Sequence, residues 1–233
     1  MLLLRYKRVS NAVKKGRDIM MKALTIAAAF GAASLSAMSL AHADSQTYDF
    51  SGFTEIDASA GVDVEVTVGG AYSVRAEGEP EALERLRIER DGSALEIGRT
   101  RNSSFFSPGR KWRVTVYVTT PELNGVDVSS GADVKAEGID AGDFSASVSS
   151  GADAVLSGRC GTIKADGSSG ADLDAENLRC ENAVADVSSG ADLILYASES
   201  LEADASSGGD ITVYGSPKNT NIDKSSGGGV SIR

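Results

Sequence analysis

Apolar and polar residues alternate along the second half of the chain, and the alternation carries a repeated phrase. Residues 126–136 read Val-Asp-Val-Ser-Ser-Gly-Ala-Asp-Val-Lys-Ala, in which every second residue is small or apolar. A period of two predicts extended strand and not helix. The phrase Ser-Ser-Gly-Ala-Asp, or a close variant, recurs with its first glycine at positions 131, 151, 170, 190, 208 and 227. Each repeat is therefore 18–20 residues long.

A repeat of this length is typical of a solenoid, in which each coil buries its apolar side only against neighbouring coils. An antiparallel meander would also alternate, but it would not stack like positions on one another. A left-handed hexapeptide helix would need three apolar-anchored sixes in each repeat, and that subdivision is missing. Crossovers between parallel strands are overwhelmingly right-handed. The sequence therefore predicts an all-β fold, a right-handed parallel β-helix.

A divergent copy of the phrase, Ser-Ala-Gly-Val-Asp, lies upstream at residues 59–63, and an insertion separates it from the first full copy. Strand-like runs in the insertion are 72–76, 86–89, 94–97 and 112–119, and a short helical run is 80–85. The polar stretch 98–110 is expected to be an exposed loop. We expect residues 44–124 to form the first coil and a β-rich N-terminal cap. Residues 125–233 should add about six coils, continuous with the cap as one domain.

The first 43 residues have the parts of a secretory signal peptide. Met21 and Lys22 precede an apolar run that ends in Ala41-His42-Ala43, and translation could start at Met20 or Met21. A membrane anchor is the alternative, although the run is rich in small residues and only marginally long enough to span a bilayer. We expect residues 1–43 to be removed and the chain to be exported, to the periplasm or the cell exterior of a Gram-negative envelope.

Removal of residues 1–43 would leave a strongly acidic chain. Residues 44–233 hold 16 basic and 32 acidic residues, a formal charge of −16. Nucleic acid and anionic membrane surfaces are therefore disfavoured partners, and no membrane span is expected in the mature chain. The one histidine, His42, would be lost with the signal peptide, which excludes imidazole from a catalytic triad or a metal site.

Two cysteines, Cys160 and Cys180, lie one repeat apart. Equivalent positions on adjacent coils are about 5 Å apart, within the range that a disulfide tolerates. Export to an oxidising compartment favours the bond. Two buried or corner thiols that never pair are the alternative, and we expect the disulfide.

The solenoid also predicts columns of carboxylates on its outer surface. Two residues after the glycine stand Asp63, Asp133, Asp153, Asp172, Asp192 and Asp210. Four residues before it stand Asp57, Asp127, Ser147, Asp166, Asp186, Asp204 and Asp223. Stacked carboxylates about 5 Å apart repel by about 0.8 kcal/mol per pair in water.

These columns have two interpretations. One is a calcium-binding ladder, because Ca²⁺ takes carboxylate and carbonyl ligands. Its candidate ligands are Asp133, Asp153, Asp172, Asp192 and Asp210. The other is that Ser and Asp side chains satisfy backbone groups at a glycine turn. The Gly-Gly-x-Gly-x-Asp nonapeptide of calcium-binding β-rolls is missing, so we favour the second interpretation and expect no cofactor.

No catalytic constellation stands out among the repeated acids. Glycoside hydrolysis needs two carboxylates in different environments, whereas these acids are repetitive. Arg159 and Arg179 could in principle hold a polyuronate substrate. A sugar platform near the cap could come from Phe105, Phe106, Trp112 and Tyr117, although such aromatics more often pack a core. We expect a non-enzymatic module, with a polysaccharide lyase or hydrolase as the alternative.

The chain resembles the putative autotransporter adhesin head GIN domain family of exported bacterial proteins, from about Phe50 to Val230. The resemblance rests on the Ser-x-Gly-x-Asp repeats and on the stretches 53–56, 61–64, 86–97 and 114–123. It implies a pectin-lyase-like β-helix without recognisable catalytic residues and an adhesive role toward a protein or glycan surface. The chain departs from many relatives in reading Ser-Ser-Gly-Ala-Asp for Gly-Ser-Gly-Asp, and it contains no Gly-Ile-Asn tripeptide.

Overall fold

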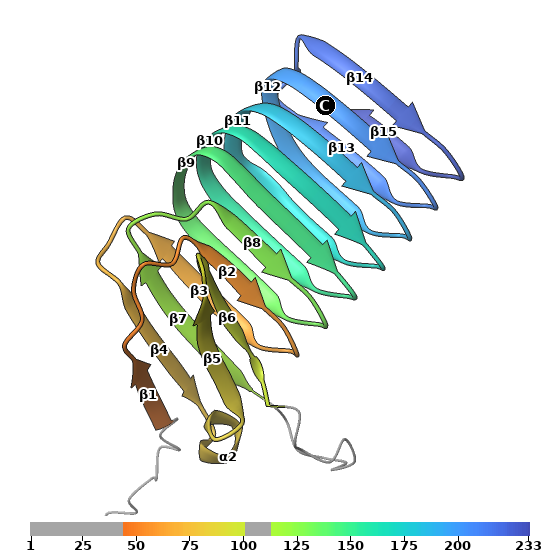
Figure 1. Ribbon diagram of the computed structural model, residues 1–233. Coiled ribbons are helices and arrows are strands. Elements are labelled where there is room, and N and C mark those ends of the chain that lie inside the picture. Colours follow the sequence, from red (N-terminus) through yellow and green to blue (C-terminus); the bar gives the residue numbers. More distant parts are fainter. Residues whose placement is uncertain (1–43, 101–112) are drawn as a thin grey trace, which may run out of the picture. The chain divides into compact units, whose positions relative to one another are not determined.

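The computed structural model describes residues 44–100 and 113–233, which are almost entirely β-strand (Figure 1). The predicted signal peptide and the candidate aromatics Phe105, Phe106 and Trp112 lie outside the described residues. All fifteen described strands belong to one continuous sheet that winds into coils. The predicted all-β solenoid is confirmed, and its handedness stays a prediction.

Four long strands form the body of the solenoid. They are β9 (Asp133–Ser149), β10 (Asp153–Ser168), β11 (Asp172–Val187) and β12 (Asp192–Ala205). Each pairs in parallel with the next, and residues one repeat apart are direct partners. The pairing register shifts near the middle of each strand, where the ribbon bends (Figure 1). We call the half before the bend the first face and the half after it the second face.

Shorter strands continue both faces. On the first face β12 pairs with β13 (Asp210–Tyr214), which pairs with β15 (Gly229–Ile232). On the second face β12 pairs with β14 (Asn219–Lys224). Ahead of β9 on the second face lies β8 (Gly125–Val128). Each face is therefore a stack of parallel strands, one from each coil.

The repeated phrase forms the sharp turn that leads from the second face of one coil to the first face of the next. Ser130 and Gly131 both have positive φ, 56° and 69°. The N–H of Ala132 donates to the carbonyl oxygen of Ser129 at 3.2 Å. Two successive residues with positive φ are the pattern of a type I′ turn. The single strand expected across residues 126–136 is thus interrupted by a turn. The sequence does not reveal this turn, because two turn residues leave the alternation of apolar and polar positions unchanged on either side.

The insertion in the N-terminal half contains a coil of its own. The first coil is β2 (Glu55–Ala58) and β3 (Asp63–Val68), which pair in parallel with β8 and β9. On their other side, β6 (Ala94–Arg99) pairs in parallel with β2 and β7 (Val114–Thr120) with β3. The strands β6 and β7 thus form the inserted coil. The repeat period did not reveal this inserted coil because its sequence lacks the Ser-Ser-Gly phrase.

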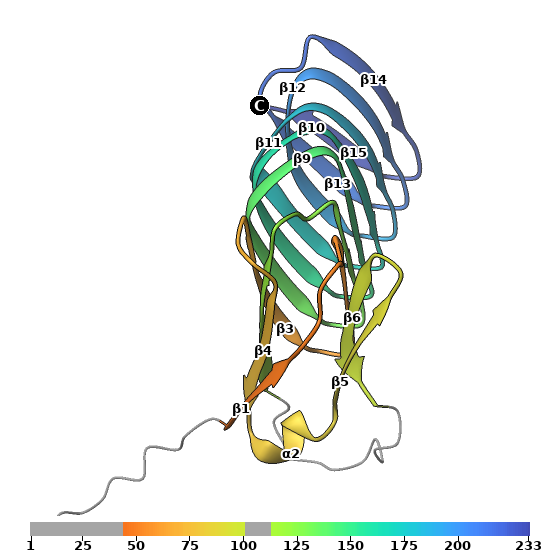
Figure 2. The same ribbon diagram turned by 60° about the vertical axis from the view of Figure 1, so that its left-hand side comes forward.

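Antiparallel strands close the N-terminal end of the stack. On the first face, β4 (Ser73–Gly78) pairs with β7, and β1 (Asp44–Tyr48) pairs with β4. On the second face, β5 (Leu86–Asp91) pairs with β6. The one-turn helix α2 (Pro80–Leu83) joins β4 to β5, and its last two residues are buried (Figure 2). Each strand and helix predicted within the insertion therefore has a counterpart in the structure.

The interior is one apolar core built from columns of small side chains. Directly after each turn, buried alanines stack as Ala132, Ala152, Ala171 and Ala191. Larger side chains such as Phe144 and Ile163 fill the second face. The bends leave still less room, since a Cβ on Gly158 would lie 2.1 Å from the carbonyl oxygen of Ile139. The close approach of neighbouring coils thus fixes which positions must be small.

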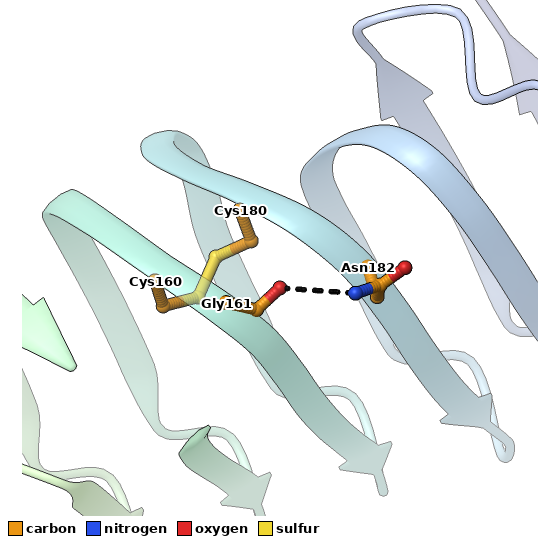
Figure 3. Close-up of a disulfide and its surroundings, with 4 residues drawn as sticks. All are labelled: Cys160, Gly161, Cys180 and Asn182. Atoms are coloured by element: carbon orange, nitrogen blue, oxygen red, sulfur yellow. Dashed lines mark hydrogen bonds between the residues drawn. A yellow bond between two sulfur atoms is a disulfide. The ribbon is translucent and has the colours of Figure 1, made fainter. Parts of the chain in front are cut away.

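A disulfide joins two adjacent coils at this bend (Figure 3). Cys160 of β10 and Cys180 of β11 are register partners, their Cα atoms are 4.5 Å apart, and both are buried. Beside them, the side-chain amide of Asn182 donates to the carbonyl oxygen of Gly161 at 3.4 Å. The hydroxyl of Ser200, one coil further on, donates to Asn182 Oδ1 at 2.6 Å. Covalent and polar contacts therefore tie three successive coils together at the bend.

Removal of this cross-link should lower stability. For a sequence separation of 20 residues, the chain-entropy estimate is about 3 kcal/mol. The double variant Cys160→Ala/Cys180→Ala should therefore melt roughly 6–12 °C lower than the parent. A reductant should lower the melting temperature of the parent and leave that of the variant unchanged, which separates the cross-link from lost packing. Full thiol labelling of the native, unreduced protein would show that the bond does not form.

Candidate functional site

The sharp turns bring two carboxylate ladders to one edge of the solenoid. The first-face ladder consists of Asp63, Asp133, Asp153, Asp172, Asp192 and Asp210, each the register partner of the next. The second-face ladder consists of Glu96, Asp57, Asp127, Ser147, Asp166, Asp186, Asp204 and Asp223. We call the two ladders together with the turn serines between them the acidic ridge.

The serine at the tip of each turn has a backbone conformation that serine rarely adopts. These tips are Ser130, Ser150, Ser169, Ser189, Ser207 and Ser226, all exposed and all with φ between 47° and 57°. A residue other than glycine with positive φ is uncommon. The acidic ridge therefore presents a row of exposed hydroxyls between its two rows of carboxylates.

Backbone groups at the ridge are satisfied by the stack itself. The backbone N–H groups of Asp153 and Asp172 donate to the carbonyl oxygens of Ala132 (3.1 Å) and Ala152 (3.0 Å) on the preceding coil. Within the described residues, no hydrogen bond holds a carboxylate of the first-face ladder. The interpretation that these side chains satisfy the turn backbone is therefore not what the structure shows. The carboxylates are left to face solvent and one another.

Partial burial, followed by like charges, raises the pKa of two aspartates of the first-face ladder. Burial raises the pKa of Asp133, and the neighbouring Asp63 and Asp153 carboxylates raise it further. Burial, followed by the charges of its two ladder neighbours, likewise raises the pKa of Asp192. Asp133 and Asp192 thus hold their negative charges less readily than isolated aspartates would.

The second-face ladder shows the same effect near the cap. Burial raises the pKa of Asp57, and the carboxylates of Asp127 and Glu96 add to the increase. Burial also raises the pKa of Asp127. Glu96 belongs to the inserted coil, and sequence analysis missed it because its stretch has no repeat phrase. The sequence did contain one indication of this position. Leu95-Glu96-Ile97 places an acidic residue between two apolar ones, as its partner stretch Ile56-Asp57-Ala58 does.

The ladders do not form a compact metal centre. In residues 44–100 and 113–233, no three His, Cys, Asp or Glu side chains are grouped so that they could hold a metal ion. The candidate calcium ligands Asp133, Asp153, Asp172, Asp192 and Asp210 lie in one line along the stack. A cation would therefore meet the carboxylates of neighbouring coils and not a surrounding cage.

The other candidate residues are engaged within the protein. Arg159 donates two hydrogen bonds to the carboxylate of Asp140, at 2.8 and 2.5 Å. The guanidinium of Arg179 lies 4.3 Å from the ring centre of Tyr196. Arginine also covers Tyr117, through Arg75 at 4.6 Å from the ring centre. Arg159 and Arg179 are thus each in contact with another side chain, and one face of the Tyr117 ring is covered by Arg75.

The part of the chain that the structure describes contains no helix of the length and apolarity needed to cross a membrane.

The sequence matches the model of a known protein family. The family model described as "Putative auto-transporter adhesin, head GIN domain" matches residues 52–217. The chain belongs to this family. No curated protein matches it.

Solved structures resemble this GIN-domain chain at low sequence identity. A putative adhesin from Bacteroides fragilis has a TM-score of 0.65 and 19% identity, covering 82% of this chain and 96% of that chain. A putative adhesin from Parabacteroides merdae has a TM-score of 0.47 and 10% identity, with coverage of 82% and 96%. The first likeness supports the fold, and the second is too distant to add to it.

The stability of the GIN-domain chain should increase on mild acidification. Because the pKa values of Asp57, Asp127, Asp133 and Asp192 are raised, the folded state binds more protons than the unfolded state as pH falls from 7. The free energy of unfolding, measured with urea between about pH 7 and pH 4.5, should therefore rise toward the ordinary aspartate pKa of about 4.

Two variants test whether the ladder causes this effect. Asp133→Asn removes two like-charge contacts and should raise stability at pH 7 by on the order of 0.5–1 kcal/mol, with a weaker pH dependence. Asp143→Asn, at an exposed carboxylate outside both ladders, should leave the pH dependence unchanged. Equal slopes for Asp133→Asn and the parent would contradict the explanation.

Salt should stabilise the protein by screening and not by specific binding. NaCl and CaCl₂ at matched ionic strength should raise the melting temperature alike, because the Debye length depends only on ionic strength, about 10 Å at 0.1 M. A specific site would add stability of RT ln(1 + [L]/Kd) at millimolar Ca²⁺. A large shift seen only with Ca²⁺, and reduced in Asp172→Asn, would show that the ladder is a calcium site.

Proposed function

We propose that the chain is an exported, non-enzymatic surface-binding module that contacts its partner through the acidic ridge. The observation that carries this proposal is the pair of in-register carboxylate ladders along the turns. Their repulsion costs stability, and among the described ladder residues only Glu96 is in an ion pair, with Arg87 at 3.7 Å. Membership of a family described by its adhesin head supports a binding role.

The charge of the ridge defines the chemistry of the partner. On the first face, the neighbouring Lys135 pairs with Glu137 at 2.6 Å and does not neutralise the ladder. Carboxylates spaced about 4.8 Å apart along a rigid stack favour a repetitive partner that carries positive charge. An amino-sugar polymer with free amines is a partner of this kind. Export is supported by the disulfide and by the family.

A non-catalytic role fits the environments of the acids. Hydrolysis at a glycosidic bond needs one carboxyl with a raised pKa beside one that stays ionised, in a single asymmetric site. Here the raised pKa values belong to aspartates on two regular ladders, each with like neighbours. Repetition along a flat edge supports binding along a polymer more than turnover at one bond.

Matched glycans and matched variants test the proposal. The protein should bind immobilised glucosamine polymer with free amines and lose that binding when the same polymer is fully N-acetylated. The triple variant Asp153→Asn/Asp172→Asn/Asp192→Asn should reduce binding at least tenfold.

A control variant has the same net charge as the triple Asp→Asn variant but keeps the acidic ridge intact. The variant Asp143→Asn/Glu181→Gln/Glu202→Gln neutralises three exposed carboxylates away from the turns and should bind nearly as the parent does. Equal losses in the two variants would reduce the effect to net charge and overturn the ridge as the binding surface. A product assay on the same polymers should show no new ends, and turnover abolished by a single Asp→Asn change would identify an enzyme.

A further inference from the structure

The two ends of the solenoid differ in how the apolar core is closed. At the N-terminal end, α2 and the antiparallel strands cover the core, and the inward residues of β5, Leu86 and Ile88, are only 9% and 8% exposed. At the other end, β14 and β15 are the last strands, and no described strand pairs with their outer edges. A solenoid coil buries its apolar face against a next coil, and within the described residues the edges of β14 and β15 have none.

The last coil is only half protected against pairing. On the second face, Thr220 and Lys224 of β14 occupy the interior columns of Leu201 and Ala205. An inward charge of this kind is a known way to discourage pairing at a sheet edge. On the first face, β15 has no such charge, because its inward residues are Val230 and Ile232, in the columns of buried Ile211 and Val213.

The backbone of β15 is also open for pairing. Gly229 and Arg233 donate their N–H groups to the carbonyl oxygens of Gly209 (3.0 Å) and Val213 (2.9 Å). Successive residues of a strand point their N–H groups to opposite sides. The N–H groups of Val230 and Ile232 therefore point away from β13. Ile232 is also one of the most exposed large apolar residues, at 43%.

We propose that β15 pairs antiparallel with β15 of a second copy of the chain, which forms a symmetric end-to-end dimer. Among the outer edge strands of the described chain, β15 alone offers apolar inward side chains without a charge. β1 is Asp-Ser-Gln-Thr-Tyr and almost fully exposed, and the outward residues of β5 are mainly charged. The open end therefore complements itself better than it complements the capped end.

Charge permits two copies to meet at this end. The first-face ladder stops before the last coil, where Gly229 takes the place of the aspartate. Residues 216–233 contain three basic residues and one acidic residue, whereas the preceding coils are acidic. Lys218 is already paired with Glu199 at 2.7 Å. Contact through β15 thus avoids opposing two acidic ladders, and a two-fold contact of this kind closes as a dimer.

Sedimentation equilibrium of the purified protein tests the proposal. The mass should rise toward two chains and no further over about three decades of concentration, since an interface well below ~1,600 Å² gives weak association. Ile232→Asp should shift the dimerisation midpoint at least tenfold to higher concentration. Val155→Asp, a comparable change at an outward position of similar exposure (44%), should leave the midpoint unchanged.

Further variants separate pairing from misfolding and from other geometries. Ile232→Pro keeps an apolar side chain, removes an N–H that points outward, and should also weaken the dimer while circular dichroism and melting stay close to the parent. Ser231→Cys should form an intermolecular disulfide on oxidation, whereas Ser45→Cys on β1 should not. Four outcomes would overturn the proposal. Two concern the mass, which would stay at one chain at all concentrations or would grow beyond two chains. The others are a disulfide between Ser45→Cys and Ser231→Cys proteins when the two are mixed, or a dimer that neither Ile232 variant weakens.

Discussion

In-register parallel stacking is the constraint on which the rest of the structure depends. Each coil places its residues directly over the equivalent residues of the preceding coil, about 4.8 Å away. Where the sequence repeats, each side chain then lies next to a side chain of the same type on the adjacent coil, and that contact must be tolerated. Alanine inside the turn meets this condition easily, as in the column of Ala132, Ala152, Ala171 and Ala191, because small apolar side chains pack on their own kind.

The same rule makes cysteine favourable and aspartate costly. Cys160 over Cys180 places two thiols within bonding distance, so stacking becomes a covalent tie between coils. Asp over Asp gains nothing inside the protein, and after burial the neighbouring carboxylates of Asp63 and Asp153 raise the pKa of Asp133 further. Charges at the opposite bend are arranged differently, since Arg159 is the register partner of Asp140 and binds it. The bend thus holds one matched ion pair, Arg159 over Asp140, whereas the ridge repeats aspartate over several successive coils.

Much of this arrangement follows from sequence, because stacking converts a period in the chain into a distance in space. The spacing of Cys160 and Cys180 and the ladder from Asp133 to Asp210 could be located in this way. Features that do not follow the repeat period could not be located from the sequence. The turn at Ser130–Gly131 leaves the alternation in phase, and the inserted coil that carries Glu96 has no repeat phrase. Its position is set by pairing with β2, a non-local contact that local pattern does not encode.

Unfavourable backbone conformations and like-charge contacts recur together in each turn of the acidic ridge. This would not be expected of a surface that has no role in binding. The turn tips are six serines and, in the first coil, Ala60, all in a conformation that costs of order 1–3 kcal/mol for a residue other than glycine. A Cβ at the following glycine, as at Gly170 or Gly190, would meet nothing within 4 Å, so crowding does not explain the choice of residues. Repelling carboxylates flank the same tips. Local rules are typically broken in this way at functional sites, where an external contact compensates. The Arg159–Asp140 pair at the bend is satisfied within the protein, and this contrast supports the proposal that the ridge is the surface that binds a partner.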